Sequence, residues 1–290
     1  MSSKIAAIIV AYHPDNKKLF KLVSALNAQG CDKIVIYRNS GLEDSLISDC
    51  FFCDFIGSGQ NMGLGTAINA SFEYLKNIFG ADFSAFTFDQ DTEVADAFVK
   101  SMCDMQLKLE ASGLRFAAIC PRVFDIRSEG YEYELPSAGA FEGFNSLRLA
   151  LQSGLLIDSH TWLNNKFNED LFIEYVDTEW CFRLGNSGRY IYRSDDSRIY
   201  HELSDELPKA FLGMKLLKYS PLRRYYFYRN SFYMLRSGDV PVYFKFRILT
   251  AFINRFISIF AFKEPRIASM KMGLIGIFDG IRSKFGKYAG

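Results

Sequence analysis

The stretch SAFTFDQD at 84–91 decides the fold of this chain, because a run of small and aromatic residues ends abruptly in two carboxylates. Such a run predicts a strand buried in a sheet. The stretch KIAAIIVAY at 4–12 is typical of a strand with both faces covered, and a Pro-Asp turn closes it. Outward from these two strands, we predict strands at 33–37 and 51–56 and helices at 15–30 and 64–79. The chain should therefore form an α/β domain with a mostly parallel central sheet.

The middle of the chain continues with mixed elements. We predict a helix at 94–112, a strand at 115–120, a polar connection at 125–146, a helix from about Asp177 and a short strand at 189–192. Ligands of open α/β sheets bind beyond the carboxyl ends of the strands. We therefore expect the site at the segments that follow the first, second and fourth predicted strands, which are Ala11-Tyr12-His13, Arg38-Asn39-Ser40 and Asp89-Gln90-Asp91.

Asp89 and Asp91 are candidate metal ligands. Two carboxylates at the end of a strand can hold one hard divalent cation, Mn²⁺ or Mg²⁺, and leave open positions for a diphosphate. His201, in the stretch YHE after a short strand, is a candidate third ligand because imidazole beside carboxylates suits manganese. The alternatives are a solvated turn for the two aspartates and a partly buried, hydrogen-bonded histidine.

A glycine-rich turn, GSGQNMGLG at 57–65, leads into the predicted helix at 64–79. Its glycines would let the backbone approach a phosphate in front of a helix N-terminus. The spacing matches neither GxxxxGK[ST] nor GxGxxG, which argues against a P-loop and against a dinucleotide-binding fold.

Asp177 and Glu179 are candidate catalytic carboxylates in the acidic stretch NEDLFIEYVDTEWCFR at 168–183. A general base must be held at a fixed position near a cleft, and the N-terminal end of a helix provides such a position. The alternative is that Asp177 caps the helix and Glu179 lies in its first turn, where a carboxylate complements the helix dipole. Capping and catalysis do not exclude each other.

Charged residues are unevenly distributed along the 290 residues. Residues 1–205 hold 18 Lys and Arg against 29 Asp and Glu, whereas residues 206–290 hold 16 against 4. Such an asymmetry commonly indicates attraction to nucleic acid or to anionic lipid. The stretches at 243–262 and 271–287 combine basic residues with Phe, Ile and Leu in a helical period, which favours helices in a membrane interface over nucleic-acid binding. The alternative is a helix at 243–262 that covers an apolar face of the α/β domain.

Signals for export are lacking. The N-terminus lacks the long apolar region and cleavage site of a signal peptide, and no run reaches the roughly 18 uncharged residues of a membrane-spanning helix. The six cysteines have no zinc-site spacing and are expected to be reduced core thiols. We therefore expect a cytoplasmic protein at the inner face of the cell membrane.

Seven stretches resemble, in order along the chain, the bacterial rhamnosyltransferases of glycosyltransferase family 2. They are AAIIVAYHPD, GQNMGLGTAINASF, FTFDQD, SGLLI, NEDLFIEYVDTEWCFRL, YHE and SPLRRYYFYRNSFYMLR. The resemblance implies a GT-A nucleotide-diphospho-sugar transferase fold. It also implies an inverting transfer of L-rhamnose from dTDP-rhamnose to a lipid-linked oligosaccharide of O-antigen, capsule or cell-wall polysaccharide.

One departure from the family pattern keeps other donors open. The second strand usually ends in Val-Asp-Asn in this family, whereas this chain has Tyr37-Arg38-Asn39. A transferase of the same fold with a UDP-hexose or UDP-galactofuranose donor is therefore the alternative among enzymes. A non-catalytic, membrane-associated scaffold is the alternative outside enzymes.

The resemblance also assigns roles to residues by position. The nucleotide-sugar site would comprise Ala11, Tyr12, His13, Asn39, Asn61, Gly63, Asp89, Gln90, Asp91, Ser153 and Gly154. Asp177 would be the base with Glu179 beside it. Among the candidate acceptor contacts Trp180, Arg223, Arg224 and Arg229, the arginines could bind the acceptor's pyrophosphate or cap the active site. The alternative for the three arginines is a solvated helix face. Residues 1–205 would form the catalytic domain and residues 206–290 a basic, aromatic-rich helical region for acceptor and membrane, and a homo-oligomer is compatible with the sequence.

Overall fold

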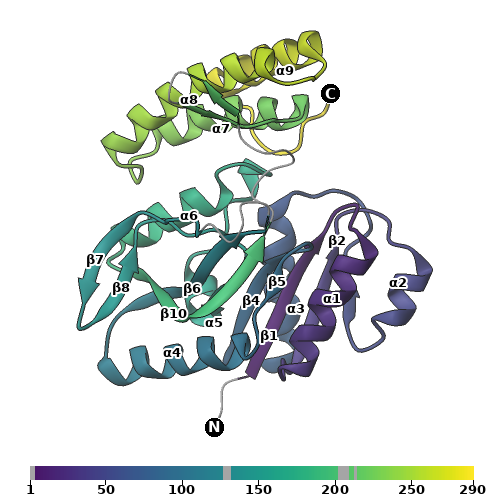
Figure 1. Ribbon diagram of the computed structural model, residues 1–290, viewed down its shortest axis with the longest axis vertical. Helices are drawn as coiled ribbons and strands as arrows, with labels where there is room; N and C mark the ends of the chain where they lie inside the picture. Colours follow the sequence, from purple (N-terminus) through teal and green to yellow (C-terminus); the bar gives the residue numbers. More distant parts are fainter. Residues whose placement is uncertain (1–3, 127–131, 202–208, 212–213) are drawn as a thin grey trace.

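The computed structural model describes residues 4–126, 132–201, 209–211 and 214–290, and a ten-stranded sheet runs through its centre. The strand order is β3-β2-β1-β4-β9-β6-β10-β8-β7, with β5 paired to β10. Strands β5, β8 and β9 run against the others, so the sheet is mostly parallel, as predicted (Figure 1). The bounds are β1 Lys4–Ala11, β2 Lys33–Arg38, β3 Asp54–Ile56, β4 Phe83–Asp89, β5 Glu93–Val94, β6 Phe116–Asp125, β7 Ser137–Phe141, β8 Phe144–Leu147, β9 Leu155–Asp158 and β10 Tyr190–His201.

Strand β1 lies between β2 and β4 and is parallel to both. Its register places Ala11 opposite Arg38 on β2 and Val10 opposite Asp89 on β4. The chain therefore changes direction across the sheet at β1, and the carboxyl ends of three strands meet at one edge. Such an edge is where α/β folds bind ligands.

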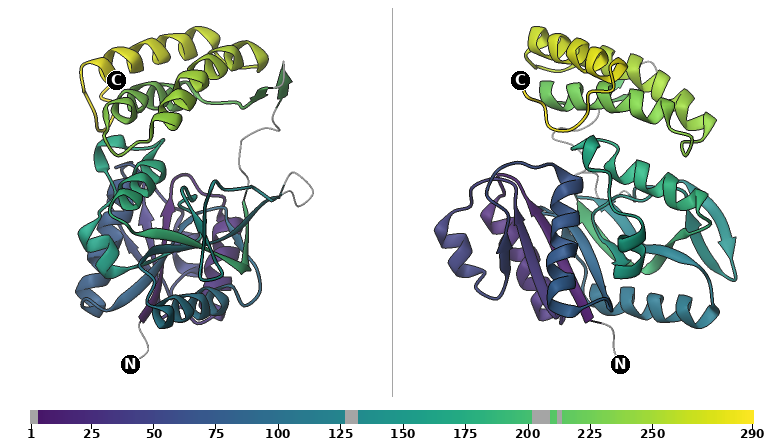
Figure 2. Two further views of the ribbon diagram at one scale, coloured as in Figure 1. Left: turned by 90° about the vertical axis from the view of Figure 1, so that its left-hand side faces the viewer. Right: turned by 180° about the vertical axis from the view of Figure 1, so that it is seen from behind.

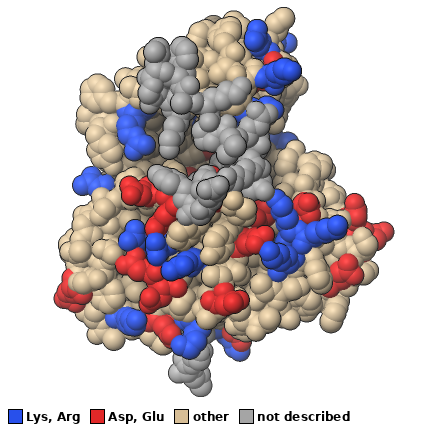
Figure 3. Space-filling view, viewed as in Figure 1, with Lys and Arg blue, Asp and Glu red and all other residues tan. Residues whose placement is uncertain are grey.

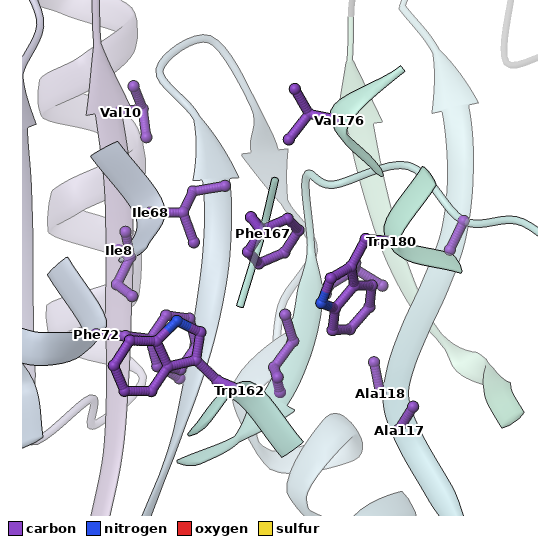
Figure 4. Close-up of a cluster of buried hydrophobic side chains, with 14 of the residues drawn as sticks. Ile8, Val10, Ile68, Phe72, Ala117, Ala118, Trp162, Phe167, Val176 and Trp180 are labelled. Carbon is purple, nitrogen blue, oxygen red and sulfur yellow. The ribbon is translucent and has the colours of Figure 1, made fainter. Parts of the chain in front are cut away.

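Helices cover both faces of the sheet, because each strand of the parallel half is apolar on both sides. The helices of the α/β body are α1 Asn16–Ala28, α2 Asp44–Asp49, α3 Leu64–Phe79, α4 Phe98–Ser112, α5 Ser159–Asn164 and α6 Val176–Asn186, with a 3₁₀ turn at Glu169–Leu171. On the face covered by α3, α5 and α6, Phe72 stacks on Trp162 with ring centroids 5.1 Å apart, and Phe167 stacks on Trp180 at 4.9 Å (Figure 4). Residues of α1, α2 and α4 form the core of the opposite face.

Most predicted elements are present, and the differences have local causes. The sequence prediction misses α2 and makes β3 too long, since residues 51–53 form a turn. The connection at 125–146 contains most of the β7–β8 hairpin. Strand β10 extends to His201 rather than ending at Tyr192, because neighbours on both sides pair with it and hold its polar middle extended.

Three helices after residue 220 form a helical layer over the carboxyl ends of the parallel strands (Figures 1 and 2). They are α7 Pro221–Arg236, α8 Val242–Ala261 and α9 Arg266–Ile281, and a small strand pair, β11 Lys209–Phe211 and β12 Met214–Leu216, precedes them. The predicted boundary between residues 205 and 206 lies outside the described residues. None of the helices in the described ranges combines the length and apolarity that crossing a bilayer requires.

The predicted helix at 243–262 corresponds to α8, whereas α9 begins five residues before the predicted 271–287. Glycines allow α9 to approach α7 closely. A Cβ atom at Gly276 would collide with the carbonyl oxygen of Tyr225, and one at Gly280 would lie 2.8 Å from the carbonyl oxygen of Arg229. The two helices therefore pack backbone against backbone.

Candidate active site

A cavity of about 760 Å³ lies between the carboxyl ends of the parallel strands and the N-terminal part of α7. Eleven of the site residues predicted from the sequence line it: Tyr12, Asn39, Asn61, Gly63, Asp89, Gln90, Asp91, Ser153, Asp177, His201 and Arg223. They come from segments far apart in the sequence. The fold thus brings the metal candidates, the nucleotide-loop candidates and one candidate base into a single space.

Asp89, Asp91 and His201 form the acidic end of this cavity. The Nε2 atom of His201 is 3.7 Å from Asp89, and its Nδ1 atom is 3.4 Å from Asp91. The Asp89 backbone N–H donates to the hydroxyl of Ser153 at 3.1 Å, which fixes the turn after β4. Burial raises the pKa of the Asp89 carboxyl; His201 opposes this shift and Asp91 adds to it. A positive charge between these groups would relieve their repulsion.

These three residues fit a divalent cation in their chemistry. The buried Nδ1 atom of His201 has no hydrogen-bond partner among the described residues, and two carboxylates face the same ring. Carboxylate and imidazole ligands suit Mn²⁺, and carboxylates suit Mg²⁺. No group of three or more His, Cys, Asp or Glu side chains in the described ranges is arranged so that it could hold a metal ion. The residues present are therefore the right donors, at ion-pair rather than ligand distances.

Side-chain amides join the end of β4 to that of β1, and the end of β2 to the glycine-rich turn. Gln90 accepts from the Tyr12 backbone N–H at 2.6 Å and donates to the Tyr12 carbonyl at 3.0 Å. Asn39 accepts from the Met62 N–H at 3.0 Å and donates to the Gly63 carbonyl at 3.2 Å. These bonds fix the backbone of the cavity wall, so the two amides position the site by holding its loops.

The glycine-rich turn differs from the phosphate cradle that the sequence suggested. A Cβ atom at Gly63, where φ is +88°, would lie 2.7 Å from the carbonyl oxygen of Phe172, and one at Gly65 would lie 2.8 Å from that of Asn168. Backbone of this chain therefore occupies the space beside both glycines. Gly63 still lines the cavity through its backbone.

Three residues predicted for the nucleotide site do not line the cavity. Ala11 is fully buried, and its carbonyl accepts from the Asn39 N–H at 2.8 Å. His13 is exposed beyond the end of β1, with its backbone N–H donating to Ser40. Gly154 has a φ of +87° and lies against Pro121, where a side chain would collide. These residues shape the turns that carry the site.

Asp177 lines the cavity at the start of α6. The left-handed residue Tyr175 precedes the helix, so Asp177 lies within its first turn and is not its cap, which corrects the capping alternative. Burial raises the pKa of its carboxyl from 3.8 to about 6, although hydrogen bonds from Thr178 at 2.7 and 3.2 Å lower it. A carboxylate with a pKa near 6 is ionised at neutral pH and still accepts a proton readily.

Glu179 and Trp180 do not line the cavity, in contrast to the sequence prediction. Glu179 is 2% exposed and pairs with Arg183 one turn along α6, at 2.9 Å. Trp180 is fully buried, and its indole N–H donates to the carbonyl of Asn165 at 2.7 Å. Successive residues of a helix point in different directions, so only Asp177 of this acidic group lines the cavity.

Arg224 and Arg229 are also wrong as acceptor contacts, because both are fully buried within the helical layer. Arg224 pairs with Glu264 at 2.7 Å and donates to Ser258 at 3.0 Å. Arg229 donates to the carbonyl oxygens of Asp170 and Leu171, each at 3.0 Å, and to that of Gly286. The alternative of a solvated basic face is wrong as well. The two guanidinium groups therefore link α7 to neighbouring segments of the chain.

The loop before α6 has a strained backbone and is hydrogen-bonded to helix α7. Phe172, Glu174 and Tyr175 all have positive φ, at +63°, +60° and +69°. The amide nitrogen of Asn230 on α7 donates to the carbonyls of Leu171, Ile173 and Glu174 at 2.8, 2.6 and 2.9 Å. The helical layer therefore fixes the loop that leads into α6, where Asp177 lies in the first turn.

Glu174 is a cavity residue that sequence reasoning did not single out. Its carboxylate pairs with Arg223 at 2.7 Å and with Arg255 at 3.0 Å. Burial alone would raise the pKa of Glu174, but the two guanidinium groups outweigh it and hold that pKa below its usual range. Arg223 remains at the cavity wall, whereas Arg255 lines a smaller cavity of about 370 Å³ beside it.

Comparisons with known proteins show the family and the fold of the chain. The chain is 30% identical over 295 residues to the dTDP-rhamnosyl transferase RfbF of Shigella flexneri, covering 97% of both chains. Its fold is similar to the crystal structure of GalNAc-T7 with UDP, GalNAc and Mn²⁺, at a TM-score of 0.55 and 12% identity. That alignment covers 69% of this chain and 44% of the other, which is much longer. No protein-family model matches the chain.

Proposed function

The chain belongs to the family of dTDP-rhamnosyl transferases and is a glycosyltransferase of GT-A fold, and from this premise we propose that it transfers L-rhamnose from dTDP-rhamnose to a lipid-linked oligosaccharide. The end-to-end alignment with RfbF carries the proposal for the donor. The cavity supports the chemistry, since it unites the carboxylate pair, the imidazole and a separate base. A bacterial surface polysaccharide, such as O-antigen, capsule or cell wall, would be the product.

The donor would bind with its diphosphate toward Asp89, Asp91 and His201. In the proposal these three side chains hold Mn²⁺ or Mg²⁺, which when bound neutralises the charge on the departing diphosphate. Tyr12, Asn39 and Asn61 line the cavity on the side of β1 and β2, where the nucleotide would lie. Arg38 donates to the carbonyl of Gly57 at 2.8 Å and does not line the cavity. Its guanidinium group would therefore not contact the nucleobase of the donor.

Asp177 would act as the general base. Its carboxylate would take the proton from an acceptor hydroxyl as that oxygen forms a bond to the anomeric carbon, while the bond from this carbon to the diphosphate oxygen breaks. Attack opposite to the departing group inverts the anomeric centre. The hydrogen bonds from Thr178 and the bonds from Asn230 to the loop would keep the carboxylate in place.

The outer face of α8 and α9 supports attachment to a membrane. On α8, apolar side chains recur every three or four residues and stay exposed: Val242, Phe246, Leu249, Ile253, Phe256 and Phe260, at 47 to 68%. On α9, Ile267 and Leu274 are 84% and 61% exposed. The polar residues Ser258 and Arg255 of α8 face α7 and the Glu174 loop instead. The helix thus exposes a row of apolar side chains in addition to the apolar residues that it buries, unlike a water-facing helix with a polar outer face.

Charge supports an anionic membrane surface as the partner. On the visible side of the helical layer, the charged side chains are mainly Lys and Arg among uncharged residues (Figure 3). Two of the acidic residues after position 205 are engaged inside the layer, Glu264 with Arg224 and Asp279 with Tyr225. Apolar burial and attraction to anionic lipid would therefore act together at the inner face of the cell membrane.

The transfer is tested with the purified protein, dTDP-rhamnose and extracted lipid-linked oligosaccharides, followed by mass spectrometry. We expect an added deoxyhexose that disappears in EDTA and with Asp91→Asn, while the circular dichroism of this variant matches the wild type. Addition of a sugar from UDP-galactofuranose or a UDP-hexose, and not from dTDP-rhamnose, would show that the proposed donor is wrong. Full activity in EDTA would remove the cation from the mechanism.

The attachment is tested by flotation with liposomes that contain anionic lipid. We expect the wild type to float at low salt and to be released at high salt, because each basic residue near the surface adds on the order of 1 kcal/mol. Phe246→Ser together with Ile253→Ser should reduce flotation. Phe51→Ser is the matched control, since Phe51 is 84% exposed on the α/β body. An equal effect of control and variant would contradict the proposal.

A further inference from the structure

Gln152 is a polar residue of the cavity wall for which the proposed mechanism has no role. Its side chain is almost entirely buried, at 4% exposure. Neither its amide nitrogen nor its amide oxygen has a hydrogen-bond partner among the described residues. A buried polar group without a partner destabilises the folded state, and native proteins contain few of them.

Gln152 differs from the other residues with an unpartnered buried atom. Ser84 and Arg38 lie away from the large cavity, Arg255 lines the smaller one, and the free nitrogen of His201 faces the Asp91 carboxylate. Among the described residues, Gln152 is the one that lines the large cavity with a donor atom and an acceptor atom both unpartnered. The cavity beside it therefore lacks a group that can both accept and donate.

The backbone of Gln152 is fixed close to the carboxylate pair. The hydroxyl of Thr87 on β4 donates to the Gln152 carbonyl at 2.7 Å, and the Gly154 N–H donates to the Thr87 carbonyl at 2.7 Å. Between them, the hydroxyl of Ser153 accepts from the Asp89 N–H. The side chain of Gln152 is thus held beside the end of β4, on the side of the cavity where the diphosphate and the transferred sugar would lie.

The chemistry of the amide selects the ligand. A diphosphate oxygen is only an acceptor and would leave the amide oxygen unpaired, whereas a hydroxyl group both donates and accepts. We propose that the Gln152 amide binds a hydroxyl of the transferred sugar and so determines which sugar the donor site accepts. This inference rests on the proposed function, because it takes the ligand to be a nucleotide-diphospho-sugar.

Stability and binding should then respond in opposite directions to one substitution. Gln152→Met replaces the amide with an apolar group of similar shape and removes two unpaired polar groups from the unliganded protein. The melting temperature of the free protein should therefore stay the same or rise. A residue retained only for packing would lose stability and leave binding unchanged.

The experiment measures melting temperatures and dissociation constants of the wild type, Gln152→Met and Gln152→Leu with dTDP alone and with dTDP-rhamnose, in the presence of Mn²⁺. We expect both variants to bind dTDP within about twofold of the wild type and dTDP-rhamnose about 5- to 30-fold more weakly. Ser84→Ala is the control, because it removes another unpartnered buried polar group outside the cavity. This control should bind both ligands as the wild type does.

The other outcomes separate a failure of this inference from a failure of the proposed function. Equal weakening for dTDP and dTDP-rhamnose would place the amide at the nucleotide or the diphosphate. Unchanged binding of both ligands would make Gln152 a packing residue. If the wild type binds a UDP-sugar in place of dTDP-rhamnose, the proposed donor is wrong, and the same comparison of that sugar nucleotide with UDP decides the role of Gln152. No binding of any nucleotide-sugar by the wild type would overturn both proposals.

Discussion

The α/β body has an apolar interior, whereas the helical layer buries charged and amide side chains among its aromatic ones. In the body, Trp162, Phe72 and Ile8 are fully buried against the sheet. In the layer, Arg229 and Asn230 are fully buried, while Ile267 is 84% exposed. The interior of the layer therefore combines aromatic packing with directed hydrogen bonds, and its outside exposes a row of apolar side chains.

This difference explains why the layer matters for the site. Apolar contacts tolerate small shifts, whereas a hydrogen bond fixes the distance and direction between two atoms. The bonds from Asn230 and Arg229 reach the loop from Asp170 to Glu174, which would otherwise relax from its positive φ values. The body supplies the carboxylates, and the layer holds the loop that carries one of them.

The largest effect is expected at the catalytic carboxylate of the body. Asp177→Asn should keep donor binding near that of the wild type and lower kcat by about 10²-fold or more, the scale of general-base catalysis. Glu179→Gln breaks a buried ion pair with Arg183 and should mainly lower the melting temperature. Steady-state kinetics and thermal unfolding separate the two. Equal loss of kcat from Glu179→Gln would transfer the role to that residue.

The pH dependence gives a second readout of the same group. Because burial raises the pKa of Asp177 to about 6, kcat should fall as the pH drops through 6. The folded state binds this proton more tightly than the unfolded state, so the stability that the group contributes is present below about pH 4 and lost as the pH rises through 6. Asp177→Asn should therefore melt no lower than the wild type at pH 7.5.

The next effect tests whether the layer positions the loop. Asn230→Asp keeps the shape of the side chain but removes the amide donor, so kcat should fall about 10- to 100-fold as the Asp177 loop shifts. Asn186→Asp is the matched control, since Asn186 donates to the carbonyl of Asp239 far along α6 from the cavity. A control that loses as much kcat as the variant would show that the layer acts only through overall stability.

The third effect concerns the close contact of α7 and α9. Gly276→Ala places a methyl group against the carbonyl of Tyr225, so α9 must move outward, at a cost of about 1–3 kcal/mol. The melting temperature should fall by several degrees. Gly185→Ala on α6 meets no atom within 4 Å and should leave stability unchanged or slightly higher. A variant at Gly276 that melts like the wild type would refute the packing of the two helices.

The smallest effect is expected on the outer face of the layer. Ile253 is 61% exposed, and Ile253→Gln should change the free energy of unfolding by no more than about 0.5 kcal/mol. Ile248 on the same helix is 1% exposed, and Ile248→Gln should cost several times more. Chemical denaturation measures both. Comparable losses would mean that the outer face of α8 is buried in solution, as in a homo-oligomer.

Some residues of the site could be predicted from the sequence and others could not. Asp89, Asp91 and Asp177 could be identified from the sequence because strand ends and a helix start place them. Glu174 and Gln152 could not, since their roles depend on Arg223, Arg255 and the cavity wall, which come from other parts of the chain. The prediction that Arg224 and Arg229 contact the acceptor is wrong, because the sequence of a basic, aromatic helix does not show which partners bury its arginines.

The sequence by itself determined the α/β body, since its strands and helices are set by local apolar patterns and by the turns between them. It also determined that α8 and α9 are amphipathic helices. The tertiary structure decided which face of α8 points outward, because Ser258 and Arg255 found partners on α7 and the Glu174 loop. It likewise decided that Asp177 and not Glu179 lines the cavity. These choices depend on contacts between residues distant in sequence, which no local pattern encodes.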